Sequence, residues 1–285
     1  MNDFHYPAGT DPRPTETFPV VQRTGIRLFR KITRFTKAVF AGVGGRAFFV
    51  GDIFRALSEP RTYLPLTMRQ MRTIGVDSLL LTAIVAAFIG AVTAFQTRYQ
   101  LFAGVQNSVV GLIVRQSIVL ELGPLLTALV LTGRVGARMT AEIGTMRVTE
   151  QIDALETLAY DPIAYLVVPR VLAALVMLPV LTILADAIGI GAAFLTATGV
   201  TDVTSAEFTE GLRLAFTEFQ IVYSLIKATF FGLAIAFFCT YEGYITEAGA
   251  EGVGRSTASA VVVTSVAILS LDVLIALLLA QNIQA

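Results

Sequence analysis

The sequence predicts an all-α membrane protein, and three observations lead to this class. Hydrophobic residues make up 55% of the 285 residues and charged residues only 15%, whereas ordinary soluble proteins carry about 25% charged residues. The mean hydropathy is +0.72. Five long apolar segments, each with at most two charges, follow one another from residue 78 onward. This composition argues against a soluble enzyme and excludes a disordered chain, collagen and a coiled coil.

The charge is balanced overall but unevenly distributed. The chain has 21 basic and 21 acidic residues, yet residues 1–72 carry a net charge of +7 and the remainder carries −7. A basic N-terminal block next to apolar spans predicts a cytoplasmic N-terminus that faces an anionic membrane surface rather than nucleic acid. The chain has one cysteine, Cys239, and one histidine, His5. These exclude a disulfide framework and clusters of cysteine or histidine ligands, so we expect no metal site and no catalytic residue.

Three regions are predicted along the chain. Residues 1–22 contain four prolines among polar residues and are predicted to be a disordered tail, with no cleaved signal peptide. Residues 23–76 are predicted to form basic interfacial and elbow helices. Within them, six basic residues of segment 23–40 fall in one arc of about 120° at helical spacing. Pro60 and Pro65 are expected to break the helices. Residues 77–285 are predicted to form a single domain of five spans.

The five predicted spans alternate across the membrane. Each is long enough to cross about 30 Å of hydrocarbon. They cover residues 78–97, 111–133, 171–201, 219–241 and 256–281. The arginines of residues 134–162 and the acidic character of residues 202–218 agree with a cytoplasmic N-terminus and an external C-terminus. No internal repeat is visible, which gives little support to a transporter built from inverted repeats.

Residues 133–162 are expected to form more than a plain connection between spans two and three. Residues Glu142 to Leu158 have the spacing of an amphipathic, mostly acidic helix, and Asp161-Pro162 provides a stop. Two neighbouring spans can be joined by a few residues. A structured insertion at the cytoplasmic face therefore suggests a partner surface.

Four ionisable residues lie at a similar depth inside the predicted spans: Glu121, Asp186, Lys227 and Asp272. Each would cost at least about 2.5 kcal/mol if it faced lipid, so we expect them to face the protein interior or a wet cavity. One interpretation is a polar collar around a bound lipid headgroup. The other is a structural lysine–carboxylate pair that locks helices together. Arg115 is expected to anchor the external interface.

The central part of the sequence resembles a known family. The relevant runs are Glu121-Leu122-Gly123-Pro124, residues 133–136, residues 141–155, Asp161-Pro162, Pro169-Arg170 and residues 252–257. Together they resemble the MlaE/YrbE permeases, the membrane subunits of ABC transporters that work with MCE-domain proteins. The resemblance covers about residues 45–280 in order and without large gaps.

The resemblance implies a homodimeric permease in a bacterial inner membrane, with a periplasmic C-terminus and phospholipid as the cargo. It implies a cytoplasmic ATPase dimer, which would hold ATP and Mg²⁺, and a hexamer of MCE-domain protein on the outer face. The chain itself has no phosphate-binding G-x-x-x-x-G-K-[ST] motif. The family also implies that the segment from Glu142 to Leu155 is a coupling helix that docks on the ATPase. The coupling residues expected are Glu142, Met146, Arg147, Glu150, Asp153 and Leu155.

The resemblance also matches Glu121 and Lys227 to polar positions that line the lipid cavity, whereas Asp186 and Asp272 are favoured as structural. An alternative function is an ion- or proton-coupled secondary transporter that uses the intramembrane carboxylates. An intramembrane enzyme is a third alternative, for which only a Ser/Lys or paired-carboxylate site would remain. The sequence leaves the direction of transport and the exact lipid open.

Overall fold

A computed structural model of the chain describes residues 44–58, 60–102, 104–247 and 249–283. The predicted tail and the basic amphipathic segment 23–40 lie outside these residues. The chain divides into two compact units, Met1–Phe49 and Val50–Ala285. In the first unit the described residues 44–49 are helical. The second unit contains every span.

All regular elements in the described ranges are helical, and these ranges contain no strand. The first half of the second unit contains α2 (Pro60–Ile74), α3 (Leu79–Gln100), α4 (Ser108–Ser117), α5 (Gly123–Leu131), α6 (Ala137–Val148) and α7 (Gln151–Thr157). Its second half contains α8 (Val168–Val200), α9 (Ser205–Arg213), α10 (Glu218–Tyr244) and α11 (Ala250–Ile283). Short 3₁₀ and π segments join some of them.

In the part of the chain that the structure describes, five helical runs are long and apolar enough to cross a membrane, as predicted. They are Tyr63–Gln100, Ser108–Val148, Ile163–Val200, Glu218–Tyr244 and Ala250–Leu279. Each run begins before the first residue of its predicted span. The predicted all-α membrane fold is therefore confirmed, and the chain is a multi-pass membrane protein.

The expectation that both early prolines break helices is half wrong. Pro60 begins α2, where a missing N–H costs nothing. Pro65 instead lies inside α2, in its second turn. There a proline removes one backbone hydrogen bond without ending the helix.

Span two is one helical run that changes register. Two π segments, Ile118–Leu122 and Thr132–Gly136, separate α4, α5 and α6. Pro124 follows the first π segment closely, in the first turn of α5. A π turn inserts an extra residue into a helix and frees backbone groups, and such turns often lie at functional sites. The register change in span two therefore falls beside Glu121, one of the predicted site residues.

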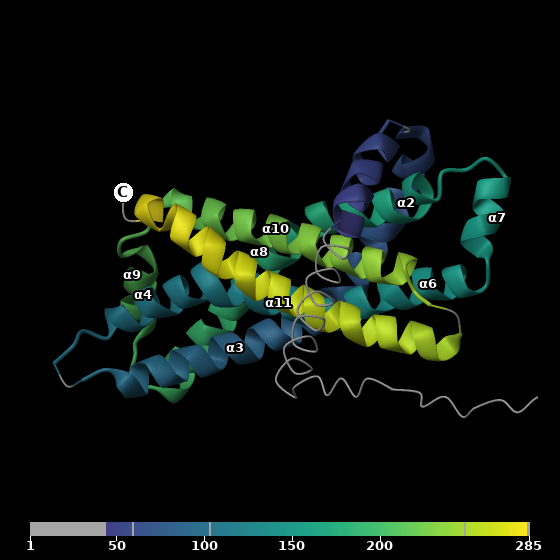
Figure 1. Cartoon of the computed structure of the whole chain (residues 1–285). Coiled ribbons are helices and arrows are strands. Elements are labelled where there is room, and N and C mark those ends of the chain that lie inside the picture. The colour runs from purple at the N-terminus through teal and green to yellow at the C-terminus, as the bar shows by residue number, and fades with distance from the viewer. Residues whose placement is uncertain (1–43, 59, 103, 248, 284–285) are drawn as a thin grey trace, which may run out of the picture. The chain divides into compact units, whose positions relative to one another are not determined.

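Helices α3 and α8 pack backbone against backbone in the middle of the bundle, where they run side by side (Figure 1). A Cβ atom placed on Gly90 of α3 would lie 1.9 Å from the carbonyl oxygen of Gly189 on α8. Close approach of this kind is the usual way in which helices associate in lipid, because apolar side chains gain nothing from leaving it.

One end of the bundle is closed by α9, which packs against α4 (Figure 1). Thr204 and Glu207 form a capping box at the start of α9. Arg98 at the end of α3 pairs with Asp202, and this guanidinium holds the pKa of the Asp202 carboxyl below its ordinary value.

Arg115 supports the other end of α9. It is buried and donates hydrogen bonds to the carbonyl oxygens of Leu212, at 2.7 Å, and Ala215, at 3.3 Å. Arg115, which we expected to anchor the external interface, instead caps the last turn of α9.

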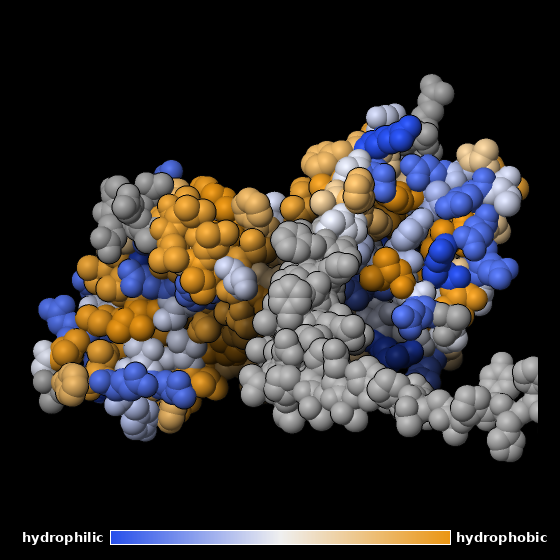
Figure 2. Space-filling model, in the orientation of Figure 1, coloured by the Kyte–Doolittle hydropathy of each residue, from blue (hydrophilic) through white to orange (hydrophobic). Residues whose placement is uncertain are grey.

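The opposite end of the bundle is polar. Hydrophilic residues gather around α6 and α7, whereas apolar side chains cover much of the half of the bundle nearer α9 (Figure 2). The last turns of α11 lie at the α9 end (Figure 1). This distribution agrees with a membrane-embedded middle and two wet ends.

The contact between α3 and α8 gives a matched pair of substitutions. Gly90→Ala places a methyl group onto the Gly189 carbonyl and should destabilise the protein by about 1–3 kcal/mol. Gly191→Ala, in the same helix as Gly189, adds a methyl group where nothing lies within 4 Å and should be neutral or slightly stabilising. Thermal unfolding midpoints in detergent measure both. Equal midpoints for the two variants would contradict the close packing.

Candidate functional site

A buried lysine joins three spans at the centre of the candidate site. Lys227 of α10 is completely buried, with 0% of its side chain exposed. Its Nζ lies 2.6 Å from Oε2 of Glu121 in span two and 2.6 Å from Oδ1 of Asp272 in α11. The ring of Tyr223, one turn earlier on α10, has its centroid 5.0 Å from the same nitrogen. We call Lys227, Glu121 and Asp272 the lysine cluster.

A backbone carbonyl completes the surroundings of the lysine. Nζ of Lys227 donates a hydrogen bond of 3.2 Å to the carbonyl oxygen of Leu120. In a regular α-helix this oxygen would accept from the N–H of residue 124, but that residue is Pro124 and has no N–H. Within hydrocarbon a backbone carbonyl without a donor costs several kcal/mol. Leu120 lies in the π segment, where the pairing of backbone groups is shifted by one residue, and the ammonium group supplies its carbonyl with a side-chain donor next to Pro124.

The lysine cluster presents negative charge to its surroundings. With all three groups ionised, two carboxylates balance one ammonium, which leaves a net charge of −1. The Glu121 side chain is 46% exposed, the Asp272 side chain 14% and the lysine not at all. A molecule that approaches this site therefore meets the Glu121 carboxylate first, and a carboxylate attracts cations and hydrogen-bond donors.

Asp186, the fourth predicted residue, lies beside the lysine cluster but outside it. Its Oδ2 accepts a hydrogen bond of 3.4 Å from Oγ of Ser224, which is one turn before Lys227 on α10. Its carboxylate also packs against Gly123, where a Cβ atom would lie 1.7 Å from Oδ1. Among the described residues Asp186 forms no ion pair. Three of the four predicted residues thus form one cluster, while Asp186 connects α8 to spans two and four.

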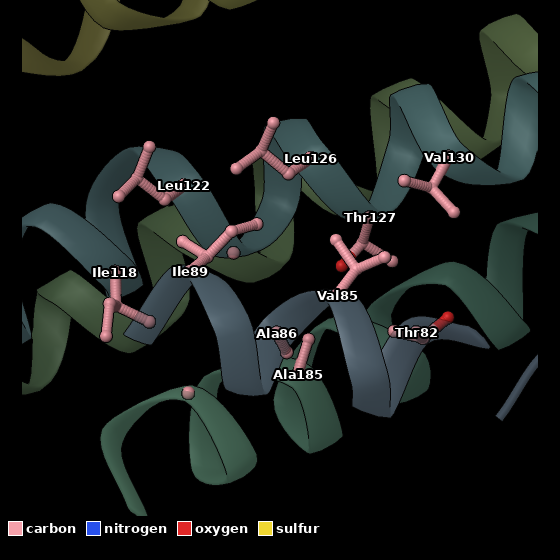
Figure 3. Close-up of a pocket in the computed structure, with 12 residues that line it drawn as sticks. Thr82, Val85, Ala86, Ile89, Ile118, Leu122, Leu126, Thr127, Val130 and Ala185 are labelled. Carbon is pink, nitrogen blue, oxygen red and sulfur yellow. The ribbon is translucent and has the colours of Figure 1, made fainter. Parts of the chain in front are cut away.

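A mainly apolar pocket lies on the side of span two that faces α3 and α8. Residues of α3, of span two and of α8 line it, and Ile118, Leu122 and Gly123 come from the same turns as Glu121 (Figure 3). The hydroxyl groups of Thr82 and Thr127 are among its few polar atoms. Val85 is also part of this wall, whereas Leu80 and Phe88 of the same helix are 73% and 69% exposed.

A second, wholly apolar groove of about 840 Å³ lies on another side of the bundle. Aromatic side chains supply much of its wall: Phe54, Phe230, Phe237 and Phe238. Both apolar surfaces suit hydrocarbon, which needs no hydrogen-bond partners.

The segment between spans two and three, which we predicted to be cytoplasmic, differs from its predicted structure. We expected one helix from Glu142 to Leu158, but α6 ends at Val148 and α7 begins at Gln151. Glu150 between them has a left-handed backbone with φ 60°. Few non-glycine residues adopt this conformation, and here it turns the chain sharply between two helices. The predicted coupling residues Glu142, Met146 and Arg147 therefore lie on α6, and Asp153 and Leu155 lie on α7.

Arg147 attaches α7 to the bundle. Its Nη1 lies 2.8 Å from Oδ1 of Asp153 on α7, and its guanidinium lies 5.9 Å from the ring centroid of Tyr244 at the end of α10. Ile152 of α7 is fully buried, whereas Leu158 and Tyr160 just after α7 are 68% and 52% exposed. Helix α7 is thus held in place by Arg147 and Ile152, and the acidic and apolar side chains on its other side are exposed.

Glu142 has a different role from its neighbours. Its Oε1 lies 2.8 Å from Nε of Arg138, and its Oε2 lies 3.0 Å from Nη2 of Arg170 at the start of α8. The Arg170 side chain is 7% exposed and also donates to the carbonyl oxygen of Leu166 at 2.6 Å. Sequence reasoning did not identify Arg170 as the partner of Glu142, although a lone arginine at the start of an apolar span was a usable signal.

Comparison with known proteins gives a consistent result. A family model described as Permease MlaE matches residues 67–278. A probable ABC transporter permease protein of Rickettsia prowazekii is 39% identical over 252 residues, which cover 88% of this chain and 96% of the relative. The intermembrane phospholipid transport system permease protein MlaE of Haemophilus influenzae is 35% identical over 82% of this chain and 90% of its own length.

A plant protein is also similar. The chloroplastic protein TRIGALACTOSYLDIACYLGLYCEROL 1 of Arabidopsis thaliana is 33% identical over 78% of this chain and 63% of its own length. The match to the family model reaches all five spans and includes the lysine cluster and α7. The chain therefore belongs to the MlaE permease family.

Proposed function

We propose that this chain is the membrane permease subunit of an ABC transporter that moves phospholipid between a bacterial inner membrane and an MCE-domain partner. It works as a homodimer, with a separate ATPase dimer on the cytoplasmic side and a hexamer of MCE-domain protein on the outer side. ATP and Mg²⁺ are held by the ATPase subunits, and this chain carries out transport rather than catalysis. Membership of the MlaE family and the name of the Haemophilus relative support phospholipid as the cargo.

The observation that carries the proposal is α7. This short helix lies outside the membrane-spanning runs, at the end of the bundle opposite α9 (Figure 1). Arg147 holds it against α6 and α10, and its outer face exposes Asp153 and Glu156. A helix fixed to two spans in this way can transmit a movement of a docked ATPase into the bundle.

The orientation of the chain in the membrane follows from the basic residues at the α7 end of the bundle. Residues 134–147 contain three arginines, so we place α6 and α7 in the cytoplasm together with the N-terminus. The α9 end and the C-terminus then face the periplasm, where an MCE-domain partner would receive or deliver lipid. In this orientation the lysine cluster lies within the membrane between the two partner surfaces.

An ion-coupled secondary transporter is less well supported. It would need carboxylates free to bind and release a coupling ion. Lys227 already engages both Glu121 and Asp272, and only Asp186 remains outside the cluster. Transport that depends on membrane potential or pH in the absence of ATP would favour this alternative.

Charge reversal on the exposed face of α7 tests the coupling. Glu150→Arg combined with Asp153→Arg should abolish association with the ATPase subunit, because the acidic docking face becomes basic. Asp153 also pairs with Arg147, so the double variant changes both the docking face and the attachment of α7. Glu156→Arg changes the charge of an exposed residue and leaves that pair intact, so it tests docking alone. Co-purification with the ATPase is the measurement. Glu210→Arg on α9, at the opposite end, is the matched control. Intact association in both α7 variants would show that this surface does not couple.

Neutralising the exposed carboxylate tests the lipid site. Glu121→Gln removes the charge that a bound headgroup meets, while Lys227 keeps its pair with Asp272. A hydrogen bond to a charged group is worth about 1.5–3 kcal/mol, so the amount of co-purified lipid should fall by at least about tenfold. Mass spectrometry of lipid extracted from the purified complex measures it. Ser270→Ala, an exposed site on α11, should leave the lipid unchanged. Unchanged identity and amount in Glu121→Gln would remove this residue from the lipid site.

A further inference from the structure

A shallow, open pocket lies between α2 and the half of span two nearer α7. We call it the α2–α6 pocket. Gln70 and Thr73 come from α2, and Arg134 and Arg138 come from the second π segment and α6. Ile74, Val135 and Met139 add an apolar floor. None of these residues takes part in the lysine cluster or in α7.

The pocket carries surplus positive charge. Both carboxylate oxygens of Glu142, its one acidic residue, are occupied: one by Arg138 and the other by the buried Arg170. The charged residues that line the pocket, Arg134, Arg138 and Glu142, have a net charge of +1. Among the described residues Arg134 forms no ion pair. The α2 sequence adds three more arginines and no acidic residue. An anion is therefore the ligand that these charges favour.

The geometry of the donors specifies the anion further. Glu142 contacts Nε of Arg138, at 2.8 Å, and so fixes the direction of this guanidinium. Arg134 lies one turn earlier on the same side of the helix. Guanidinium groups match phosphate oxygens in a planar, two-pronged arrangement, and the side-chain amide of Gln70 offers a further donor. Ile74 and Met139 beneath these donors are almost completely buried, so a ligand contacts the exposed guanidinium groups, and an amphiphile held by its phosphate keeps its acyl chains in the surrounding membrane.

We propose that the α2–α6 pocket binds the phosphate group of a membrane phospholipid in the leaflet on the α7 side. Naming this leaflet cytoplasmic rests on the proposed function, but the phosphate site itself does not. The site is separate from the lysine cluster, which presents a carboxylate and would repel phosphate. The two sites thus prefer opposite parts of a zwitterionic headgroup.

Lipid binding to the purified full-length chain tests the proposal. The delipidated chain in non-ionic detergent is titrated with dioleoyl phosphatidylglycerol, with dioleoylglycerol, which lacks the phosphate, and with sodium phosphate. Native mass spectrometry counts the bound molecules. The variants are R134Q, R134Q combined with R138Q, and R134K, and the control is R213Q, an exposed arginine on α9. R134Q alone leaves the pair between Arg138 and Glu142 intact, so it still tests the site if the double variant misfolds.

The expected result is a loss of phosphatidylglycerol affinity of at least about tenfold in the double variant and a smaller loss in R134Q. R134K should keep most of the affinity, R213Q should match the unaltered chain, and dioleoylglycerol should bind weakly to all of them. Unchanged phosphatidylglycerol binding in the double variant would overturn the site. Equal binding of dioleoylglycerol, or equally tight binding of inorganic phosphate, would overturn the assignment to a phospholipid.

The assay contains no ATPase and measures no transport, so its failure is distinct from failure of the proposed function. If instead the double variant loses ATPase association and keeps its lipid, the pocket binds a protein surface and the proposal is wrong.

Discussion

The burial of one ammonium group organises this membrane domain. Lys227 is fully enclosed within a span, where an unpaired charge is too costly to keep. It persists because two carboxylates and one carbonyl oxygen surround its Nζ. These partners come from spans two and five, so the lysine of span four can be satisfied only when all three spans are assembled in one arrangement.

Other features of span two are tied to this constraint. Pro124 removes one backbone donor from the first turn of α5, and the π segment before it changes the direction in which Glu121 points. The absence of a side chain at Gly123 lets Asp186 of α8 approach the same turn. Close packing of α3 on α8 then completes a bundle whose middle is apolar and whose two ends are polar. The polar groups lie at the depth of the lysine and at the ends, and the surfaces between them are apolar.

Much of this arrangement could be predicted from the sequence, and the remainder could not, for identifiable reasons. Uninterrupted apolar runs with rare charges predict the spans, because hydrocarbon tolerates little else. The depth of Glu121 and Lys227 predicts that they face inward. Depth along a helix does not determine its rotation, so the partnership of Asp272 with Lys227 and the separation of Asp186 emerged only from three-dimensional packing. The segment between spans two and three shows the same limit, because helical spacing continues through residues 142–158 and does not indicate that Glu150 adopts a left-handed backbone. Likewise, sequence spacing does not show that Glu142 pairs with the buried Arg170 at the start of α8.

The most direct test of the central interaction is a comparison of unfolding free energies in detergent for two neutralised variants. Lys227→Met alone leaves two carboxylates facing each other without a cation, and breaking a buried pair in this way costs about 3–5 kcal/mol. Lys227→Met combined with Glu121→Gln and Asp272→Asn removes every charge of the cluster and should recover most of that loss. A single variant as stable as the unaltered chain, or a triple variant no more stable than the single one, would contradict the central role of the buried lysine.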